Sequence, residues 1–111
     1  MTQEIQNALL AHSAKIEEVQ KMCRIGEKDV GEAKIAKVKE LCFAIEAELY
    51  SEYIVAPAWD YLGFPHMIFE KSDSYDYSEL SDRRKDLSIM KTLDDIEGLI
   101  YVDIAEYNAV L

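Results

Sequence analysis

The chain has little of what disulfide frameworks, phosphate-binding loops and membrane spans are made of. Two cysteines in 111 residues are too few for a disulfide framework. The four glycines form no G-x-G or Walker pattern, which excludes a glycine-rich phosphate loop. No apolar run approaches the roughly 18 residues of a membrane helix, and the start, Met1-Thr2-Gln3-Glu4, lacks a basic signal-peptide region. These absences predict a soluble cytoplasmic protein, or one of a host's cytoplasm if a phage encodes it.

Catalytic signatures are scarce as well. The sequence has no H-E-x-x-H, no G-x-S-x-G and no EF-hand spacing. His12 is expected near Cys42, with Glu46 one turn further, and such a cluster could activate a thiolate or bind a metal. The favoured interpretation is a histidine at the edge of the core, hydrogen-bonded to a carboxylate. His66 is expected at the rim of the molecule. We therefore predict no enzyme, no cofactor and no metal.

The acidic charge is concentrated in the second part of the chain. Residues 1–45 hold seven acids and seven bases, whereas residues 46–111 hold fifteen acids and five bases. Residues 46–82 carry nine acids against Lys71 alone. A basic nucleic-acid footprint is absent apart from the run Arg83, Arg84 and Lys85, so direct nucleic-acid binding is not expected. Acidity on one side of a protein favours solubility and attracts a basic partner surface.

Apolar spacing in the first part of the chain predicts two helices of about 20 residues each. Thr2 can cap the first helix and Gly26 can end it, and Asp29 with Glu32 resembles a capping box before the second. The short connection favours an antiparallel hairpin over residues 1–52. The inward positions, spaced three and four apart, are Ile5, Leu9, His12, Ile16, Val19 and Cys23 in the first helix and Ile35, Val38, Cys42, Ile45 and Leu49 in the second.

The rest of the chain is harder to assign. Pro57, Gly63 and Pro65 break any helix there, so residues 53–78 are predicted to be an irregular, aromatic and acidic segment. In residues 79–111, a T-x-x-D cap at 92–95 predicts a last helix that faces Ile100 and Ile104 inward. Alternatively "GLIYVDI" is a strand that pairs with "HMIF" or "LSIM". We predict one mainly α domain over residues 1–111, with an α+β arrangement, the hairpin on a small sheet from segments of 66–104, as the alternative.

Eight of the eleven aromatic residues lie between positions 50 and 77. The rings of Trp59, Tyr61, Phe64 and Phe69 are expected to cover the open side of the hairpin, which cannot bury its own stripe. Tyrosines among carboxylates are typical of contact surfaces, because they combine a rigid ring, a polar tip and steering charge. The predicted partner-binding residues are Tyr53, Asp60, Tyr61, Asp73, Tyr75, Asp76, Tyr77 and Glu79.

These features favour a non-catalytic interaction protein over an enzyme. Its acidic surface would block a basic site on a nucleic-acid-handling protein, as phage anti-defence inhibitors, immunity proteins and proteins that imitate nucleic acid do. One alternative is an assembly protein that forms a homodimer or larger oligomer through its helical hairpin. Another is a protein that sequesters an anionic, nucleotide-like ligand with Arg83, Arg84 and Lys85.

Overall fold

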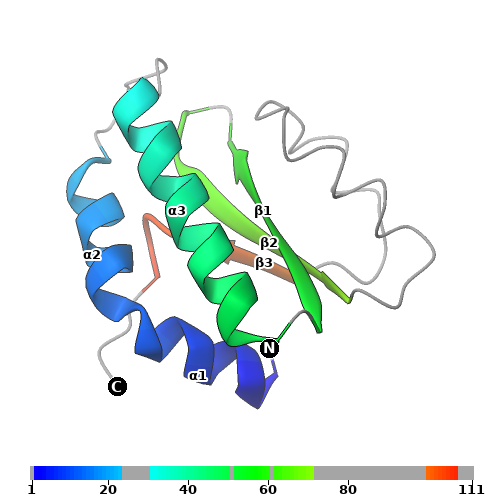
Figure 1. The fold of residues 1–111 in the computed structure, drawn as a ribbon. Coiled ribbons are helices and arrows are strands. Elements are labelled where there is room, and N and C mark those ends of the chain that lie inside the picture. Colours follow the sequence, from blue (N-terminus) through cyan, green and yellow to red (C-terminus); the bar gives the residue numbers. More distant parts are fainter. Residues whose placement is uncertain (1, 24–30, 51, 61, 72–99, 108–111) are drawn as a thin grey trace.

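In the described part of the chain, three helices lie on one face of a three-stranded antiparallel sheet (Figure 1). The computed structural model describes residues 2–23, 31–50, 52–60, 62–71 and 100–107. Its elements are α1 (Gln3–Ala11), α2 (Ser13–Lys21), α3 (Glu32–Glu48), β1 (Tyr53–Trp59), β2 (Pro65–Lys71) and β3 (Ile100–Asp103). This mixed architecture fits the α+β alternative. A helix over residues 100–103 is contradicted, because these residues form β3.

The first predicted helix is two helices. Thr2 caps α1 as expected, since its Oγ1 accepts a hydrogen bond from the backbone N–H of Ile5 at 3.3 Å. The helix ends at Ala11, and His12, with φ −115° and ψ 23°, separates it from α2. The inward stripe survives this break: its aliphatic members Ile5, Leu9, Ile16 and Val19 are all buried.

Helices α2 and α3 run antiparallel beside each other (Figure 1), as the hairpin prediction requires. Ion pairs join them: the Nζ atom of Lys15 lies 3.5 Å from a carboxylate oxygen of Glu40, and that of Lys37 lies 3.4 Å from one of Glu18. Charges on this side of the molecule therefore compensate one another. None of the described helices is long and apolar enough to cross a membrane.

The sheet has the strand order β1-β2-β3. Val55 of β1 pairs with Phe69 of β2, and Met67 of β2 pairs with Val102 of β3. The predicted "HMIF" strand is confirmed as part of β2, whereas the segment after residue 52, predicted to be irregular, is the strand β1. Buried residues lie on both faces of β1, which explains its uninterrupted apolar sequence.

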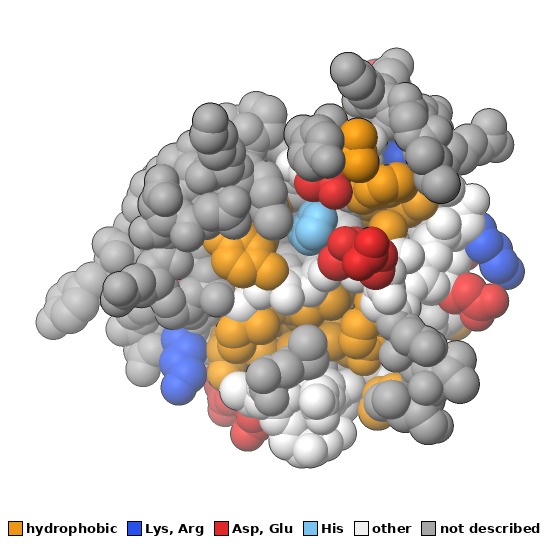
Figure 2. Space-filling view, turned by 180° about the vertical axis from the view of Figure 1, so that it is seen from behind, with side chains coloured by type: hydrophobic (Ala, Val, Ile, Leu, Met, Phe, Trp, Pro, Cys, Tyr) orange, Lys and Arg blue, Asp and Glu red, His pale blue; other side chains and the backbone are white. Residues whose placement is uncertain are grey.

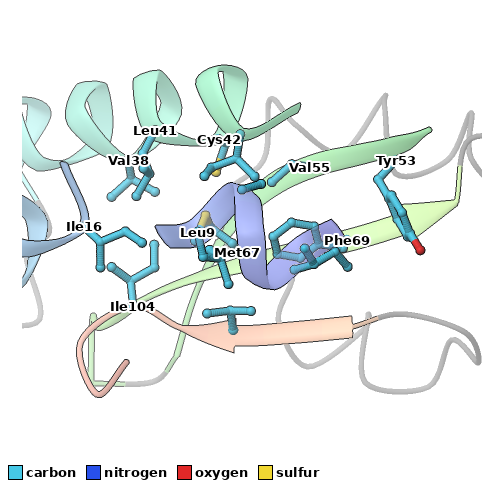
Figure 3. Packing of buried hydrophobic residues seen from close by; sticks show 14 of the residues in the cluster. Leu9, Ile16, Val38, Leu41, Cys42, Tyr53, Val55, Met67, Phe69 and Ile104 are labelled. Carbon is cyan, nitrogen blue, oxygen red and sulfur yellow. The ribbon is translucent and has the colours of Figure 1, made fainter. Parts of the chain in front are cut away.

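One core joins the helices to the sheet. The side chains of Leu9, Val38, Met67 and Phe69 are fully buried and point into the space between α3 and the strands (Figure 3). The expectation that apolar rings cover the hairpin is confirmed for Trp59 and Phe69, which belong to this core. Aromatic burial of this kind supplies a large share of the hydrophobic stabilisation of a small domain.

Candidate functional site

Asp60 ends the first strand and builds the turn that follows. Its Oδ1 accepts hydrogen bonds from the backbone N–H groups of Leu62 and Phe64, both at 2.9 Å. The backbone N–H of Gly63 donates to the carbonyl of Asp60 at 3.0 Å. Gly63 has a φ of 84°, which glycine adopts without steric cost. The turn thus fixes the carboxylate of Asp60 through one of its two oxygens.

Asp103 has the same role at the end of β3. Its Oδ1 accepts hydrogen bonds from the backbone N–H groups of Ala105 at 3.0 Å and Glu106 at 3.3 Å. The backbone N–H of Ile104 donates to the carbonyl of Pro65 at 3.0 Å, which holds this turn against the start of β2. The second oxygen of Asp103 is therefore oriented by a fixed backbone, as that of Asp60 is.

His66 lies between these two carboxylates. It is paired with Ala58 of β1 and with Asp103 of β3. Its Nε2 lies 3.6 Å from Oδ2 of Asp60 and 4.0 Å from Oδ2 of Asp103. These distances exceed those of hydrogen bonds, and the buried Nε2 has no hydrogen-bond partner within the described part of the chain. Figure 2 shows a histidine between acidic side chains on the side opposite to that of Figure 1.

The exposure of the three side chains decides what they can contact. The side chain of His66 is 12% exposed, that of Asp60 24% and that of Asp103 32%. The two carboxylates thus retain surface through which they can attract a cation, whereas the imidazole is mostly covered. We call Asp60, His66 and Asp103 the carboxylate–histidine cluster. Its geometry suits recognition of a basic side chain, because carboxylates held by a rigid backbone need little ordering on binding.

Cys23 follows α2 at the same end of the molecule. Burial raises the pKa of its thiol; Lys34 opposes this shift, and the negative charges of Asp103 and Asp60 add to it. The Sγ donates a hydrogen bond to the carbonyl of Val19 at 3.3 Å. Because the thiolate is the nucleophile in cysteine chemistry, a raised pKa disfavours catalysis by this residue.

Lys34 is the buried base of this region, with 4% of its surface exposed. Among the described residues, no carboxylate lies within ion-pair distance of it. Within the same ranges, no three histidine, cysteine or carboxylate groups are arranged to hold a metal ion. Lys34 lies in the first turn of α3, on the face that packs against the sheet, where its aliphatic stem contributes to packing.

The predicted cluster of His12, Cys42 and Glu46 does not form as expected. The Nε2 of His12 lies 3.6 Å from a carboxylate oxygen of Glu48, while Glu46 accepts a hydrogen bond from the backbone N–H of Val55. His12 therefore lies at the edge of the core beside the carboxylate of Glu48, as expected, but the expected hydrogen bond is not formed among the described residues, because 3.6 Å exceeds hydrogen-bond range and Nε2 is without such a partner there.

Two of the eight predicted partner-binding residues lie among the described residues. Asp60 is in the carboxylate–histidine cluster. Tyr53 is 5% exposed and belongs to the core, so we leave it out of the surface proposed below. The others lie outside the described residues, as do Arg83, Arg84 and Lys85: Tyr61, Asp73, Tyr75, Asp76, Tyr77 and Glu79. Asp103 was missed, because no local pattern indicates that β3 brings it beside His66.

Comparison with known proteins identifies no relative. No protein-family model, no curated protein and no solved structure matches this chain.

Proposed function

We propose that this protein is a non-catalytic inhibitor that docks its acidic end onto a basic surface of another protein. The observation that carries the proposal is the convergence of Asp60 and Asp103 on His66 at one end of the sheet. Both carboxylates are held by backbone N–H groups and both are partly exposed. A rigid acidic site of this kind favours arginine or lysine of a partner and raises the rate of encounter.

The charge distribution along the chain also supports a basic partner. On the helical side, Lys15 and Lys37 compensate neighbouring glutamates, and residues 1–45 have no net charge. The acidic excess belongs to residues 46–111, which supply both carboxylates of the cluster. The two carboxylates of the cluster therefore favour docking of a basic partner at this end of the sheet.

The class of partner follows from this chemistry. Proteins that handle nucleic acids expose basic surfaces for phosphate groups, and carboxylates on a rigid support can occupy them. We therefore propose a nucleic-acid-handling protein as the target, with inhibition resulting from occupation of its phosphate-binding surface. Binding is expected to weaken steeply as salt rises, because exposed charges are screened.

The test uses a variant that removes charge and preserves the turns. Asparagine keeps the Oδ1 acceptor of aspartate, so Asp60→Asn with Asp103→Asn removes two charges while the backbone hydrogen bonds remain. The matched control is Glu4→Gln with Glu32→Gln, which removes two charges from exposed positions on the helices. Affinity capture from the native cell identifies a partner, and titration of that purified partner then compares the three proteins.

We expect the variant of the cluster to bind the purified partner at least about tenfold more weakly at low salt, since close charge pairs across an interface contribute on the order of 1.5 kcal/mol or more. The helical control should bind like the parent. Charge reversal at Asp73, Asp76 and Glu79 tests the part of the surface that only the sequence predicts. Equal binding by parent and cluster variant at low salt would show that the acidic end is not the docking surface.

A further inference from the structure

Helix α3 carries a second heptad-like row on the side that faces away from the sheet. The row comprises five exposed residues of the helix at spacings of three and four, Ala33, Ala36, Glu40, Phe43 and Ala47, and continues into the exposed Tyr50, which lies beyond the last helical residue, Glu48. We call it the outer row. Phe43 is 53% exposed and Tyr50 is 86% exposed. In Figure 1, α3 lies in front of the sheet, so the view is onto the outward side of this helix. A spacing of three and four residues is the period of helix pairs in coiled coils.

Tyr50 supplies an independent observation. It follows the cap residue Leu49 and has a φ of 53°, in the left-handed region. Helices commonly end with glycine in this conformation, because a side chain there costs about 1 kcal/mol or more. A large ring is thus kept at a strained position although it is almost fully exposed and contributes little to the core. Strain retained at an exposed residue points to a contact outside the chain.

Charge decides which partner fits the outer row. Glu40 is its only charged member, and its two carboxylate oxygens lie 3.5 Å from Nζ of Lys15 and 3.7 Å from Nζ of Lys37. The row is therefore close to neutral. A second copy of this chain, with a net charge of −10, would be repelled by the acidic end but not by this helix. The neutral helical side is where two such copies can meet.

The order of side-chain sizes along the row is also self-complementary. Small residues, Ala33 and Ala36, stand at its start, and the rings of Phe43 and Tyr50 stand toward its end. If two copies pack antiparallel, Tyr50 of one copy faces Ala33 of the other and Ala36 faces Ala47. Phe43 then covers the aliphatic part of Glu40. Large side chains meet small ones along the whole row, as close packing requires.

We infer that the outer row is the interface of a homodimer, with α3 of each copy packed antiparallel across a two-fold axis between Glu40 and Phe43. The interface differs from the hairpin seam expected from the sequence, because that seam faces the sheet. A helix of 17 residues is about 25 Å long, so the contact is short and the dimer has a dissociation constant on the order of micromolar or weaker. The inference does not rest on the proposed function, and the acidic end stays accessible in the dimer.

Sedimentation equilibrium of the full chain over a wide concentration range tests the inference. The parent is expected to pass from monomer to dimer. Phe43→Glu should raise the dissociation constant at least about tenfold, because it places an unpaired charge in an apolar contact. Gln6→Glu is the control, since it adds the same charge at an exposed position of α1 and should leave the association unchanged. Circular dichroism checks that both variants are folded.

Tyr50→Gly distinguishes a role of Tyr50 in the dimer from a role in the stability of the monomer. Glycine relieves the left-handed strain, so the melting temperature of the monomer is expected to rise, while loss of the ring weakens the dimer. A cysteine pair then fixes the direction of packing: a mixture of Ala36→Cys and Ala47→Cys should yield a disulfide between the two variants more readily than between identical copies. A parent that remains monomeric at the highest concentration, or a dimer that Phe43→Glu leaves intact, overturns the inference.

Discussion

The carboxylate of Glu46 on α3 accepts a hydrogen bond from the backbone N–H of Val55 on β1, with 2.9 Å between Oε2 and the nitrogen. Val55 is thus paired through its N–H with a side chain and not with β2. Backbone N–H groups alternate in direction along a strand, so position 57 points the same way, and Pro57 has no N–H there. Among the described strands, β1 lies at the end of the order. Glu46 thus satisfies one outward donor of β1, and Pro57 removes another.

The variant Glu46→Ala is expected to destabilise the protein by about 1.5–3 kcal/mol, because a backbone N–H loses a charged acceptor. Urea unfolding measures the change. Glu46→Gln keeps an acceptor oxygen and should therefore lose less stability than Glu46→Ala. Glu52→Ala removes an exposed carboxylate and serves as the control, with a change within about 0.5 kcal/mol. Equal stability of Glu46→Ala and the parent would show that this hydrogen bond contributes nothing net.

Gln20 joins α2 to the end of the described chain. Its Nε2 donates to the carbonyl of Ile104 at 2.9 Å and to that of Tyr107. Gln20→Glu replaces a donor by a charged acceptor that faces two carbonyl oxygens, so we expect a loss of about 1–3 kcal/mol. Hydrogen exchange should show faster exchange of the amides in residues 100–107. Gln3→Glu changes the same side-chain type at an exposed position, and exchange in that segment should then stay at the parent's rate.

The turn after β1 depends on an acceptor at position 60. Asp60→Ala removes the acceptor for two backbone N–H groups and should destabilise the protein by about 1–3 kcal/mol. Asp60→Asn should cost less than about 1 kcal/mol, because its side-chain oxygen still accepts these bonds. Thermal unfolding of the two variants side by side measures the difference. If both variants lose the same stability, the charge of Asp60 stabilises the fold, and its hydrogen bonds in the turn do not.

Cys23 makes the stability depend on pH in the alkaline range. Burial, with the nearby carboxylates, raises the pKa of the folded thiol above its ordinary value of 9.0. Below that value the thiol is protonated in both the folded and the unfolded protein, and its contribution to the free energy of unfolding is fully present. As the pH rises, the unfolded thiol ionises first, so stability falls until the pH passes the pKa of the folded thiol. Unfolding free energies should therefore decrease more between about pH 8 and about pH 10 in the parent than in Cys23→Ser.

The reactivity of Cys23 can also be measured, by alkylation of its thiol. Alkylation of Cys23, read by mass spectrometry of its peptide, should be slow near neutral pH, because the thiolate is the reactive form. Asp60→Asn with Asp103→Asn removes two charges that raise its pKa and should make alkylation faster at a given pH. An unchanged rate in this double variant would contradict the influence of the two carboxylates.

The helices were predictable because apolar spacing is a local property of the sequence. Ile5, Leu9, Ile16 and Val19 are inward in the structure as in the pattern. The break at His12 was not predicted, because the same spacing continues through it. The outer row of α3 was also overlooked, since alanine contributes little to an apolar pattern although its spacing is regular.

The strands were harder because their burial depends on neighbours distant in sequence. β1 has no alternation of apolar and polar residues, and Pro57 was interpreted as a break, although proline is tolerated where its missing N–H points away from the partner strand. Ile100 and Ile104 are spaced as on one face of a helix, yet pairing of residues 100–103 with β2 overrides that pattern. The same pairing brings Asp103 to His66, and no local signal in either segment predicts that.

The burial of Lys34 makes it a natural probe of folding by amine labelling. At 4% exposure its amine is shielded from acylating reagents, whereas Lys21, with a side chain that is 75% exposed, reacts at once. Modification of Lys34 therefore requires a local opening that exposes its amine. Its acylation rate, relative to that of Lys21 in the same molecule, reports how often this part of the protein opens under native conditions.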